Sequence, residues 1–238
     1  MMKNLKNWDK KTWLSSDKYI FKLIQFLEKL INFNKETKIL DIGCGRGKII
    51  STLSKKYKMN NFPLGIDIVK HKNSAKNIRF IKINALKYLE KTKEKFDVIL
   101  FKQSIHFLKL KEIKKILRVS KQNLTPKGKI LILALYPKKI QWPLFKAFKL
   151  RLIKSLVKDR IILNLIKFSF KEYKINYFTF KVKMSRDSYL QMIKNRFNSC
   201  LLNLSSKELK IGVEEIKKSY KNKLIFCDKL ICISFKKK

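Results

Sequence analysis

The chain has 238 residues, of which 45% are hydrophobic, enough for one domain with a sizeable core. Gly and Pro are scarce, at 6 and 4 residues, which excludes collagen-like and linker-dominated chains. No apolar run approaches the roughly 18 charge-free residues of a membrane-spanning helix, and the N-terminal residues lack the apolar core of a signal peptide. We therefore expect a cytoplasmic protein. Four cysteines without a Cys-x-x-Cys pair predict neither a disulfide framework nor a metal site.

Lysine dominates the charge. The chain has 58 Lys and Arg residues but only 17 Asp and Glu residues, so its formal net charge is +41. A basic surface favours nucleic-acid binding, because it releases counterions from phosphates. The lysines are nevertheless spread through every segment, and arginine, the residue typical of bidentate phosphate recognition, is rare. We interpret the charge as a lysine-coated surface of compositional origin, which still steers anionic substrates inward, and nucleic-acid binding stays the less favoured alternative.

Strands and helices are predicted to alternate through the first 136 residues. Residues 1–35 are expected to be helical, because apolar residues recur at helical spacing between Tyr19 and Phe33. Five strands are expected at residues 38–42, 62–67, 78–84, 96–102 and 129–136. Helices are expected at residues 48–56 and 110–123, and a turn at residues 125–128. This alternation is typical of βαβ units.

The pattern becomes less regular after Tyr136. A basic, apolar-rich helical stretch is expected at residues 138–172, strands at 175–184 and 224–235, and helices at 187–197 and 205–220. Ser205 and Glu208 have the spacing of a capping box. Without a repeat or a low-complexity linker, the sequence predicts one α/β domain. We expect a Rossmann-like, seven-stranded, mostly parallel sheet with helices on both faces.

The most informative stretch joins the first strand to the helix after it, and its letters are I-L-D-I-G-C-G-R-G. Glycines there let the backbone approach a ligand, and the helix N-terminus offers free N–H groups. The dinucleotide pattern G-x-G-x-x-G fails, because its third glycine would fall on Lys48. The phosphate-loop pattern fails at the same residue.

The pattern that fits is D-x-G-x-G-x-G, formed by Asp41, Gly43, Gly45 and Gly47. It resembles the first motif of the class I S-adenosylmethionine-dependent methyltransferases, in particular the small-molecule branch of type 11 and type 25 methyltransferases. The resemblance covers residues 38–136, and includes F-D-V-I-L at residues 96–100 and T-P-K-G-K-I at residues 125–130.

The resemblance implies a set of cofactor-binding residues besides Asp41 and the three glycines. Asp67 ends the second strand, where a carboxylate suits the two ribose hydroxyls, and Ile68 follows it. Asn84 and Ala85 end the third strand, where the family often has an acidic residue on the adenine amino group. Asn84 departs from that pattern, but its carbonyl oxygen accepts the same hydrogen bond.

The loop after the fourth strand is implied to face the reaction centre. Gln103 is expected to contact the cofactor or the substrate, and His106 is either a general base or a side chain that orders the loop beside Phe107. The loop lacks the Asn/Asp-Pro-Pro-aromatic motif of amino-methylating nucleic-acid enzymes. His71, between two lysines, is expected at the surface.

Aromatic residues before the first strand, Trp8, Trp13 and Tyr19, are expected in a helix that closes over the substrate, or alternatively one that anchors to the core. Residues 138–172 are interpreted as a substrate cap; a plain core helix and contact with an anionic membrane surface are the alternatives. Arg196 lies in a segment that resembles aconitate-type methyltransferases, which implies a clamp on a substrate carboxylate.

The sequence thus predicts methyl transfer from S-adenosylmethionine to a small molecule, by O-methylation of an organic acid or metabolite. The alternatives are an RNA or protein methyltransferase and a non-catalytic cofactor-binding regulatory protein. The expected parts are an N-terminal helical cap at 1–35, a cofactor-binding core at 36–137, a substrate-cap insertion at 138–175, and C-terminal strands and helices at 176–238.

Overall fold

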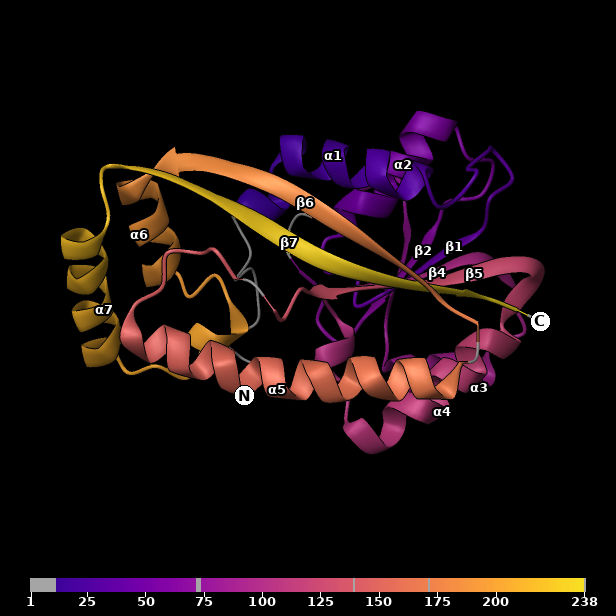
Figure 1. Cartoon of the computed structure of the whole chain (residues 1–238). Helices are drawn as coiled ribbons and strands as arrows, with labels where there is room; N and C mark the ends of the chain where they lie inside the picture. The colour runs from indigo at the N-terminus through magenta and orange to yellow at the C-terminus, as the bar shows by residue number, and fades with distance from the viewer. Residues whose placement is uncertain (1–11, 72–73, 139, 171, 238) are drawn as a thin grey trace.

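The structure, a computed structural model, describes residues 12–71, 74–138, 140–170 and 172–237. It contains one seven-stranded sheet, whose strands are β1 (Ile39–Ile42), β2 (Leu64–Asp67), β3 (Arg79–Lys82), β4 (Phe96–Lys102), β5 (Leu124–Leu135), β6 (Lys174–Ser185) and β7 (Lys223–Lys236). Their order across the sheet is β3-β2-β1-β4-β5-β7-β6 (Figure 1). β1 to β5 pair in parallel, whereas β7 is antiparallel to both β5 and β6. The predicted Rossmann-like, mostly parallel sheet is confirmed.

Helices cover both faces of this sheet (Figure 1). They are α1 (Asp17–Glu28), α2 (Lys48–Tyr57), α3 (Ala85–Lys91), α4 (Leu110–Gln122), α5 (Lys146–Ser169), α6 (Arg186–Lys194) and α7 (Ser206–Ser219). Within the described ranges there are also three short 3₁₀ turns, η2 (Trp13–Ser15), η3 (Ile105–Phe107) and η4 (Ser199–Leu201). No helix among the described residues is long and apolar enough to cross a membrane.

Two apolar layers form the core, one on each face of the sheet. Alternate residues of a strand point to opposite faces, so β4 sends Leu100 into one layer and Phe101 into the other. The first layer packs against α1, α2, α6, α7 and the first half of α5. The second layer packs against α3, α4 and the second half of α5. A single long helix therefore connects the two layers.

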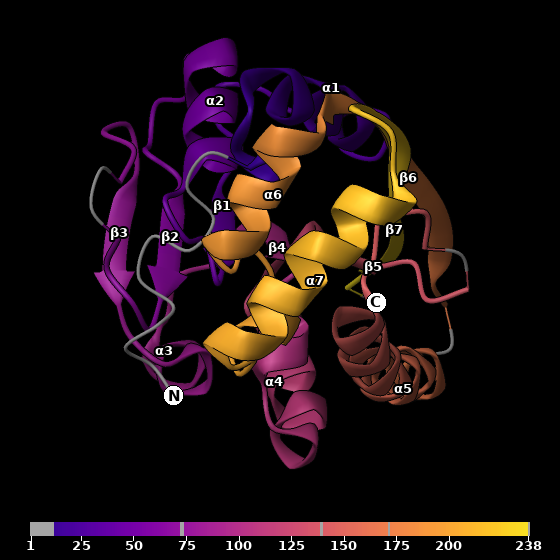
Figure 2. The same ribbon diagram turned by 90° about the vertical axis from the view of Figure 1, so that its left-hand side faces the viewer.

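Helices α6 and α7 form a layer that lies in front of β1 and β4 in the view of Figure 2, whereas β2 and β3 lie to one side of it. β6 and β7 extend beyond the other strands to reach these helices (Figure 1). Ser205 and Glu208 form the predicted capping box at the start of α7, with both reciprocal hydrogen bonds present.

Three sequence-based element assignments are wrong in detail. Residues 125–128 belong to β5, where the chain bulges between the pairs Phe96–Leu124 and Val98–Lys129. The Thr125 hydroxyl donates to Asp97 (2.7 Å), which holds this bulge against β4 instead of turning the chain. Within residues 138–172 the helix begins only at Lys146, and within residues 12–35 α1 ends at Glu28.

Candidate functional site

The glycine loop lies between the carboxyl end of β1 and the start of α2. Gly43, Gly45 and Gly47 have φ values of 75°, 56° and 70°, in the left-handed region that favours glycine. The Gly43 N–H donates to the carbonyl of Ile66 (2.8 Å), so the end of β2 fixes the first turn of the loop. Sequence-based reasoning found this loop because three glycines are spaced within five residues.

The three glycines differ in what surrounds them. A Cβ on Gly43 would lie 2.4 Å from the Ser104 Cβ, and a Cβ on Gly47 would lie 2.2 Å from the Ile78 Cδ1. A Cβ on Gly45 would meet no heavy atom within 4 Å. Gly43 and Gly47 are therefore required by close packing inside the protein. Gly45 presents bare backbone to open space, where a ligand can approach it.

Asp67 ends β2 and faces the same loop. Its Oδ2 accepts a hydrogen bond from the Gly45 N–H (2.9 Å), and its Oδ1 accepts one from the Val69 N–H (3.0 Å). Each oxygen keeps a second lone pair for a hydroxyl donor. Ile68, the next residue, is 41% exposed, so an apolar surface lies beside the carboxylate.

Asn84 and Ala85 lie where β3 gives way to α3. The Asn84 Oδ1 accepts a hydrogen bond from the Lys87 N–H (3.1 Å), which makes Asn84 the N-cap of α3. Ala85 is buried as the first residue of that helix. The amide oxygen of Asn84 is thus held in place at the sheet edge with one lone pair engaged.

A row of buried charges crosses the α1 face of the sheet at this edge. Asp41 on β1 is 2% exposed, and its Oδ1 has no hydrogen-bond partner among the described residues. Burial raises the pKa of Asp41 to about 7; the Lys102 ammonium opposes this shift, and Asp67 adds to it. A carboxylate this costly to bury needs a cationic or hydrogen-bonding partner to be ionised at neutral pH.

Asp228 on β7 is the second buried carboxylate of the row, and it is completely inaccessible to solvent. Burial raises its pKa, which Lys102 and the nearby Trp13, Tyr19 and Trp142 side chains lower in part. These donors face the carboxylate without reaching hydrogen-bonding geometry, since neither oxygen has a partner within the described part of the chain. Lys102 thus lowers the pKa of both buried carboxyl groups. Its ammonium also lies 5.2 Å from the centre of the Tyr19 ring.

Trp13 and Tyr19, two predicted substrate residues, lie in this buried cluster. Trp13 packs edge-on against Trp142, with ring centroids 5.5 Å apart, and it stacks on Tyr189 of α6 at 6.3 Å. Both side chains are at most 5% exposed and belong to the first core layer, so they do not line an open surface. Trp8 lies outside the described residues.

The loop after β4 carries the two predicted catalytic residues. Gln103 has a φ of 53°, and its N–H donates to the Leu133 carbonyl (2.8 Å), which turns the chain sharply at the strand end. The adjacent Ser104 hydroxyl donates to the Ile42 carbonyl (2.5 Å), so this loop is tied to the glycine loop. Gln103 is thereby placed at the carboxyl end of β4, next to β1.

His106 lies in η3, and its ring packs on Phe107 with centroids 4.2 Å apart. Its backbone carbonyl accepts a hydrogen bond from the Lys158 ammonium of α5 (2.7 Å). Burial, together with the Lys158 charge, lowers the pKa of His106 to about 4. The imidazole is therefore neutral at pH 7 and is a weak proton acceptor.

Arg196 and His71 are placed differently from what the sequence indicates. The Arg196 Nη1 donates to the carbonyls of Leu201 and Leu204 (2.6 Å each), so the guanidinium holds the turn around η4. That geometry gives no support to a substrate clamp. His71 is 8% exposed, which corrects the expectation of a surface residue.

The structure thus brings together the glycine loop, Asp41, Asp67 and Gln103 at one edge of the sheet, and Tyr19 lies beside Lys102. Sequence reasoning did not identify the polar or aromatic residues that complete this edge, namely Lys102, Ser104, Trp142 and Asp228. Lys102 could have been found from strand alternation, because Leu100 and Lys102 share a face. Among the described residues, no group of three or more His, Cys, Asp or Glu side chains could hold a metal ion.

Solved structures with the same architecture are methyltransferases. One is an S-adenosylmethionine-dependent methyltransferase from Thiobacillus denitrificans in complex with S-adenosylhomocysteine; it has a TM-score of 0.58 and 14% identity, over 97% of each chain. Another is a putative methyltransferase from an antibiotic biosynthesis pathway of Anabaena variabilis, with a TM-score of 0.61 and 14% identity, over 89% of this chain and 96% of that chain. A third, from Geobacter sulfurreducens, also contains S-adenosylhomocysteine, with a TM-score of 0.52 and 16% identity, over 91% of this chain and 90% of that chain. These similarities establish a class I methyltransferase fold.

The family model described as "methyltransferase domain" matches residues 33–159, more than half of the chain. No curated protein matches the sequence. The chain therefore belongs to the methyltransferase domain family. The matched segment runs from before β1 into α5, so it contains the glycine loop, Asp67 and the loop after β4.

Proposed function

We propose that this protein transfers a methyl group from S-adenosylmethionine to a small-molecule acceptor at the carboxyl ends of β1 and β4. One observation carries the proposal: a glycine loop with open space above Gly45 is held by Asp67, next to the buried carboxylate of Asp41, whose Oδ1 has no hydrogen-bond partner among the described residues. The family match and the two neighbouring structures that contain S-adenosylhomocysteine support the same cofactor.

The residues present fit the chemical groups of this cofactor. The free lone pairs of Asp67 suit a ribose diol, and exposed Ile68 suits a face of the adenine ring. Asp41 suits the ammonium group of the methionine moiety, because an opposite charge stabilises a buried carboxylate. Backbone at Gly45 and the N-terminus of α2 suit the methionine carboxylate.

When bound, S-adenosylmethionine supplies an electrophilic methyl group on a sulfonium ion. The protein's own contribution is to position the acceptor, and alignment of this kind can contribute about 7–11 kcal/mol. Gln103 at the sharp turn after β4 is the residue we propose to contact the acceptor or the methionine moiety. The buried Trp13, Tyr19 and Trp142 cluster excludes water from this edge of the sheet.

We propose an organic acid or similar metabolite, methylated on oxygen, as the acceptor. A carboxylate is already ionised at neutral pH, so its methylation needs no general base. This agrees with the pKa of about 4 for His106, which makes it a poor base for an alcohol or a phenol. Lys102 at the end of β4 places a positive charge near Asp41 and Asp228 and lowers the pKa of both carboxyl groups.

The net charge of +41 favours RNA as a second acceptor class. The layer of α6 and α7 argues against it, because a large substrate that approached β1 and β4 from the side seen in Figure 2 would meet these helices. We propose that this layer, together with residues 138–175, forms the substrate cap of a single domain.

Calorimetric titration of S-adenosylmethionine and S-adenosylhomocysteine, with NAD as a control, tests the cofactor. Micromolar binding of the first two and none of NAD is expected at physiological salt. Transfer of labelled methyl to a panel of carboxylic acids, phenols and RNA then identifies the acceptor class. Cofactor binding with no product from any acceptor would indicate a regulatory protein, and the absence of cofactor binding would overturn the proposal.

A further inference from the structure

The helix α5 has an apolar face that no other part of the described structure covers. Its large side chains are about half exposed at four positions, Leu150 (55%), Ile153 (50%), Val157 (51%) and Ile161 (48%), and Phe168 is 88% exposed. At 100° per residue these five positions form a stripe about 80° wide and about 27 Å long. The exposed Asn164 interrupts this stripe between Ile161 and Phe168. Isolated exposed apolar residues need no explanation, but five on one face of a helix mark an interaction surface.

The opposite face of α5 is also apolar and is buried in both core layers. Its buried members are Phe148, Leu152, Leu156, Ile162, Leu163 and Ile166, together with Asp159. The stripe is therefore not the core-facing side of a displaced helix. A surface helix with one core-facing side is expected to be polar on the other.

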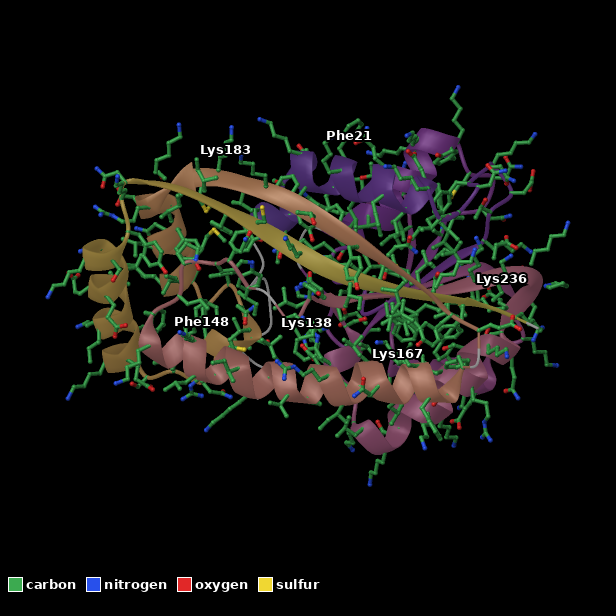
Figure 3. All side chains as sticks on the ribbon, viewed as in Figure 1. Phe21, Lys138, Phe148, Lys167, Lys183 and Lys236 are labelled. Atoms are coloured by element: carbon green, nitrogen blue, oxygen red, sulfur yellow. The ribbon has the colours of Figure 1, made fainter. Side chains whose placement is uncertain are left out.

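Cations flank the stripe on both sides. Lys149, Arg160 and Lys167 lie along one border, and Lys154 lies along the other. The helix carries seven Lys and Arg residues and a single acidic residue, Asp159, which is on the buried face. Figure 3 shows α5 along one outer side of the molecule, with Lys167 near one end of the helix. An apolar stripe with basic borders is the pattern of helices that lie in the surface of an anionic membrane.

Two partners could cover this stripe, a second copy of the chain or an anionic membrane, and the net charge favours the membrane. A second copy of a chain with a charge of +41 would bring two basic borders together, which is repulsive. An anionic lipid surface attracts the same borders and accepts the apolar stripe between them. We propose that α5 docks this protein on the surface of anionic membranes, with Leu150, Ile153, Val157, Ile161 and Phe168 inserted among the lipid chains.

Co-sedimentation with vesicles tests the proposal, because it separates insertion of the stripe from general attraction. The parent protein is mixed with vesicles of phosphatidylcholine containing 30% phosphatidylserine, or of phosphatidylcholine alone, at about 150 mM salt. We expect strong binding only to the first. The stripe variant Ile153→Asn/Val157→Asn/Phe168→Asn should lose at least tenfold in partitioning. The control Phe21→Asn/Ile211→Asn/Ile225→Asn changes three exposed apolar residues on other elements and should bind like the parent.

A second pair of variants has equal net charge. Lys149→Gln/Arg160→Gln/Lys167→Gln removes the three cations of one border, and Lys181→Gln/Lys183→Gln/Lys223→Gln removes three exposed cations of β6 and β7. Only the first should weaken binding markedly. Tryptophan emission of Phe168→Trp should shift to the blue on vesicle addition, and that of Phe21→Trp should not.

Equal vesicle binding by the parent and the stripe variant would overturn the proposal, as would equal weakening by the two charge variants. Sedimentation velocity provides the other contradicting result. A parent dimer that the stripe variant converts to a monomer, without any change in vesicle binding, would assign the stripe to a second copy of the chain. Unchanged S-adenosylhomocysteine binding or unchanged thermal unfolding in each variant shows that the fold is retained.

Discussion

The Asp67 carboxylate accepts a hydrogen bond of 2.9 Å from the backbone N–H of Gly45, 22 residues earlier in the chain. The end of β2 thereby holds the middle of the glycine loop in place. Because Gly45 is the glycine that faces open space, this bond orients the backbone that a ligand meets. The residue proposed to bind ribose thus also shapes the binding loop.

Replacing Asp67 with Ala removes both interactions. We expect S-adenosylhomocysteine binding to weaken by about 1.5–3 kcal/mol, roughly 10- to 150-fold, the scale of hydrogen bonds to charged groups. Isothermal titration calorimetry measures the change. Asp17→Ala, at an exposed position of α1, is the control and should leave the affinity unaltered. Unchanged affinity in a folded Asp67→Ala variant would refute the ribose assignment.

Gly45→Ala and Gly47→Ala should separate binding from stability. Both positions have positive φ, which costs a non-glycine residue about 1–2 kcal/mol. At Gly47 the new methyl also collides with the Ile78 side chain, so this variant should unfold at the lower denaturant concentration. At Gly45 the methyl enters the open space above the loop, so cofactor affinity should fall more than stability. Chemical denaturation and calorimetry on both variants check this order.

Asp41 should make stability depend on pH. Its pKa in the folded protein is about 7, above the unfolded value of about 3.9. The folded state therefore keeps a proton that the unfolded chain releases, and this group lowers stability as pH rises from about 4 to 7. Asp41→Asn removes the effect, so its stability relative to the parent should increase across that window, by up to a few kcal/mol.

Urea unfolding of the parent and of Asp41→Asn at pH 5 and pH 8 measures this difference. Comparing the two proteins cancels the contributions of other titrating groups, including His106. Asp187→Asn, at an exposed position of α6, is the control, and its free energy of unfolding should change between the two pH values by the same amount as that of the parent. If the free energy of unfolding of Asp41→Asn changed between pH 5 and pH 8 by the same amount as that of the parent, the raised pKa of Asp41 would be contradicted.

His106→Asn should have a small effect on the methylation of a carboxylic acid, less than about tenfold in kcat, because general-base catalysis usually contributes 10²–10⁴-fold. With a pKa of about 4, His106 is neutral throughout pH 6–8, and the rate should show no histidine step in that range. Steady-state kinetics at several pH values check both expectations. A loss of 100-fold or more would instead indicate proton transfer by His106.

Arg196→Ala should destabilise the protein without a comparable change in cofactor affinity. The guanidinium donates to two carbonyls at 2.6 Å around η4, and buried hydrogen bonds to charged groups contribute about 1.5–3 kcal/mol. Thermal unfolding should show the loss, and Arg118→Ala, at an exposed position of α4, should show none. A stable Arg196→Ala variant with a raised KM for the acceptor would restore the clamp hypothesis.

The parallel half of the fold was predictable because β1, β2 and β4 are short apolar runs, each followed by a loop or a helix. The glycine loop was predictable for a different reason, since its three glycines occupy consecutive alternate positions. Neither signal exists for Asp228, whose role depends on β7 reaching beyond β5 to meet Trp13 and Trp142. Likewise, periodicity could not assign the two faces of α5, because both are apolar.

The position of β7 has a consequence for how the chain folds. β6 pairs with no described strand except β7, and β7 is the later of the two in the sequence, yet it lies between β6 and β5. During synthesis, β6 therefore has no described strand to form hydrogen bonds with until β7 has emerged from the ribosome. Pairs between β5 and β7, such as Lys129–Lys236, close loops of more than a hundred residues. Contacts of such long sequence separation form slowly. Closure of the sheet over Asp228 is thus expected to be the late, rate-limiting event of folding, when β6 is the edge most exposed to aggregation.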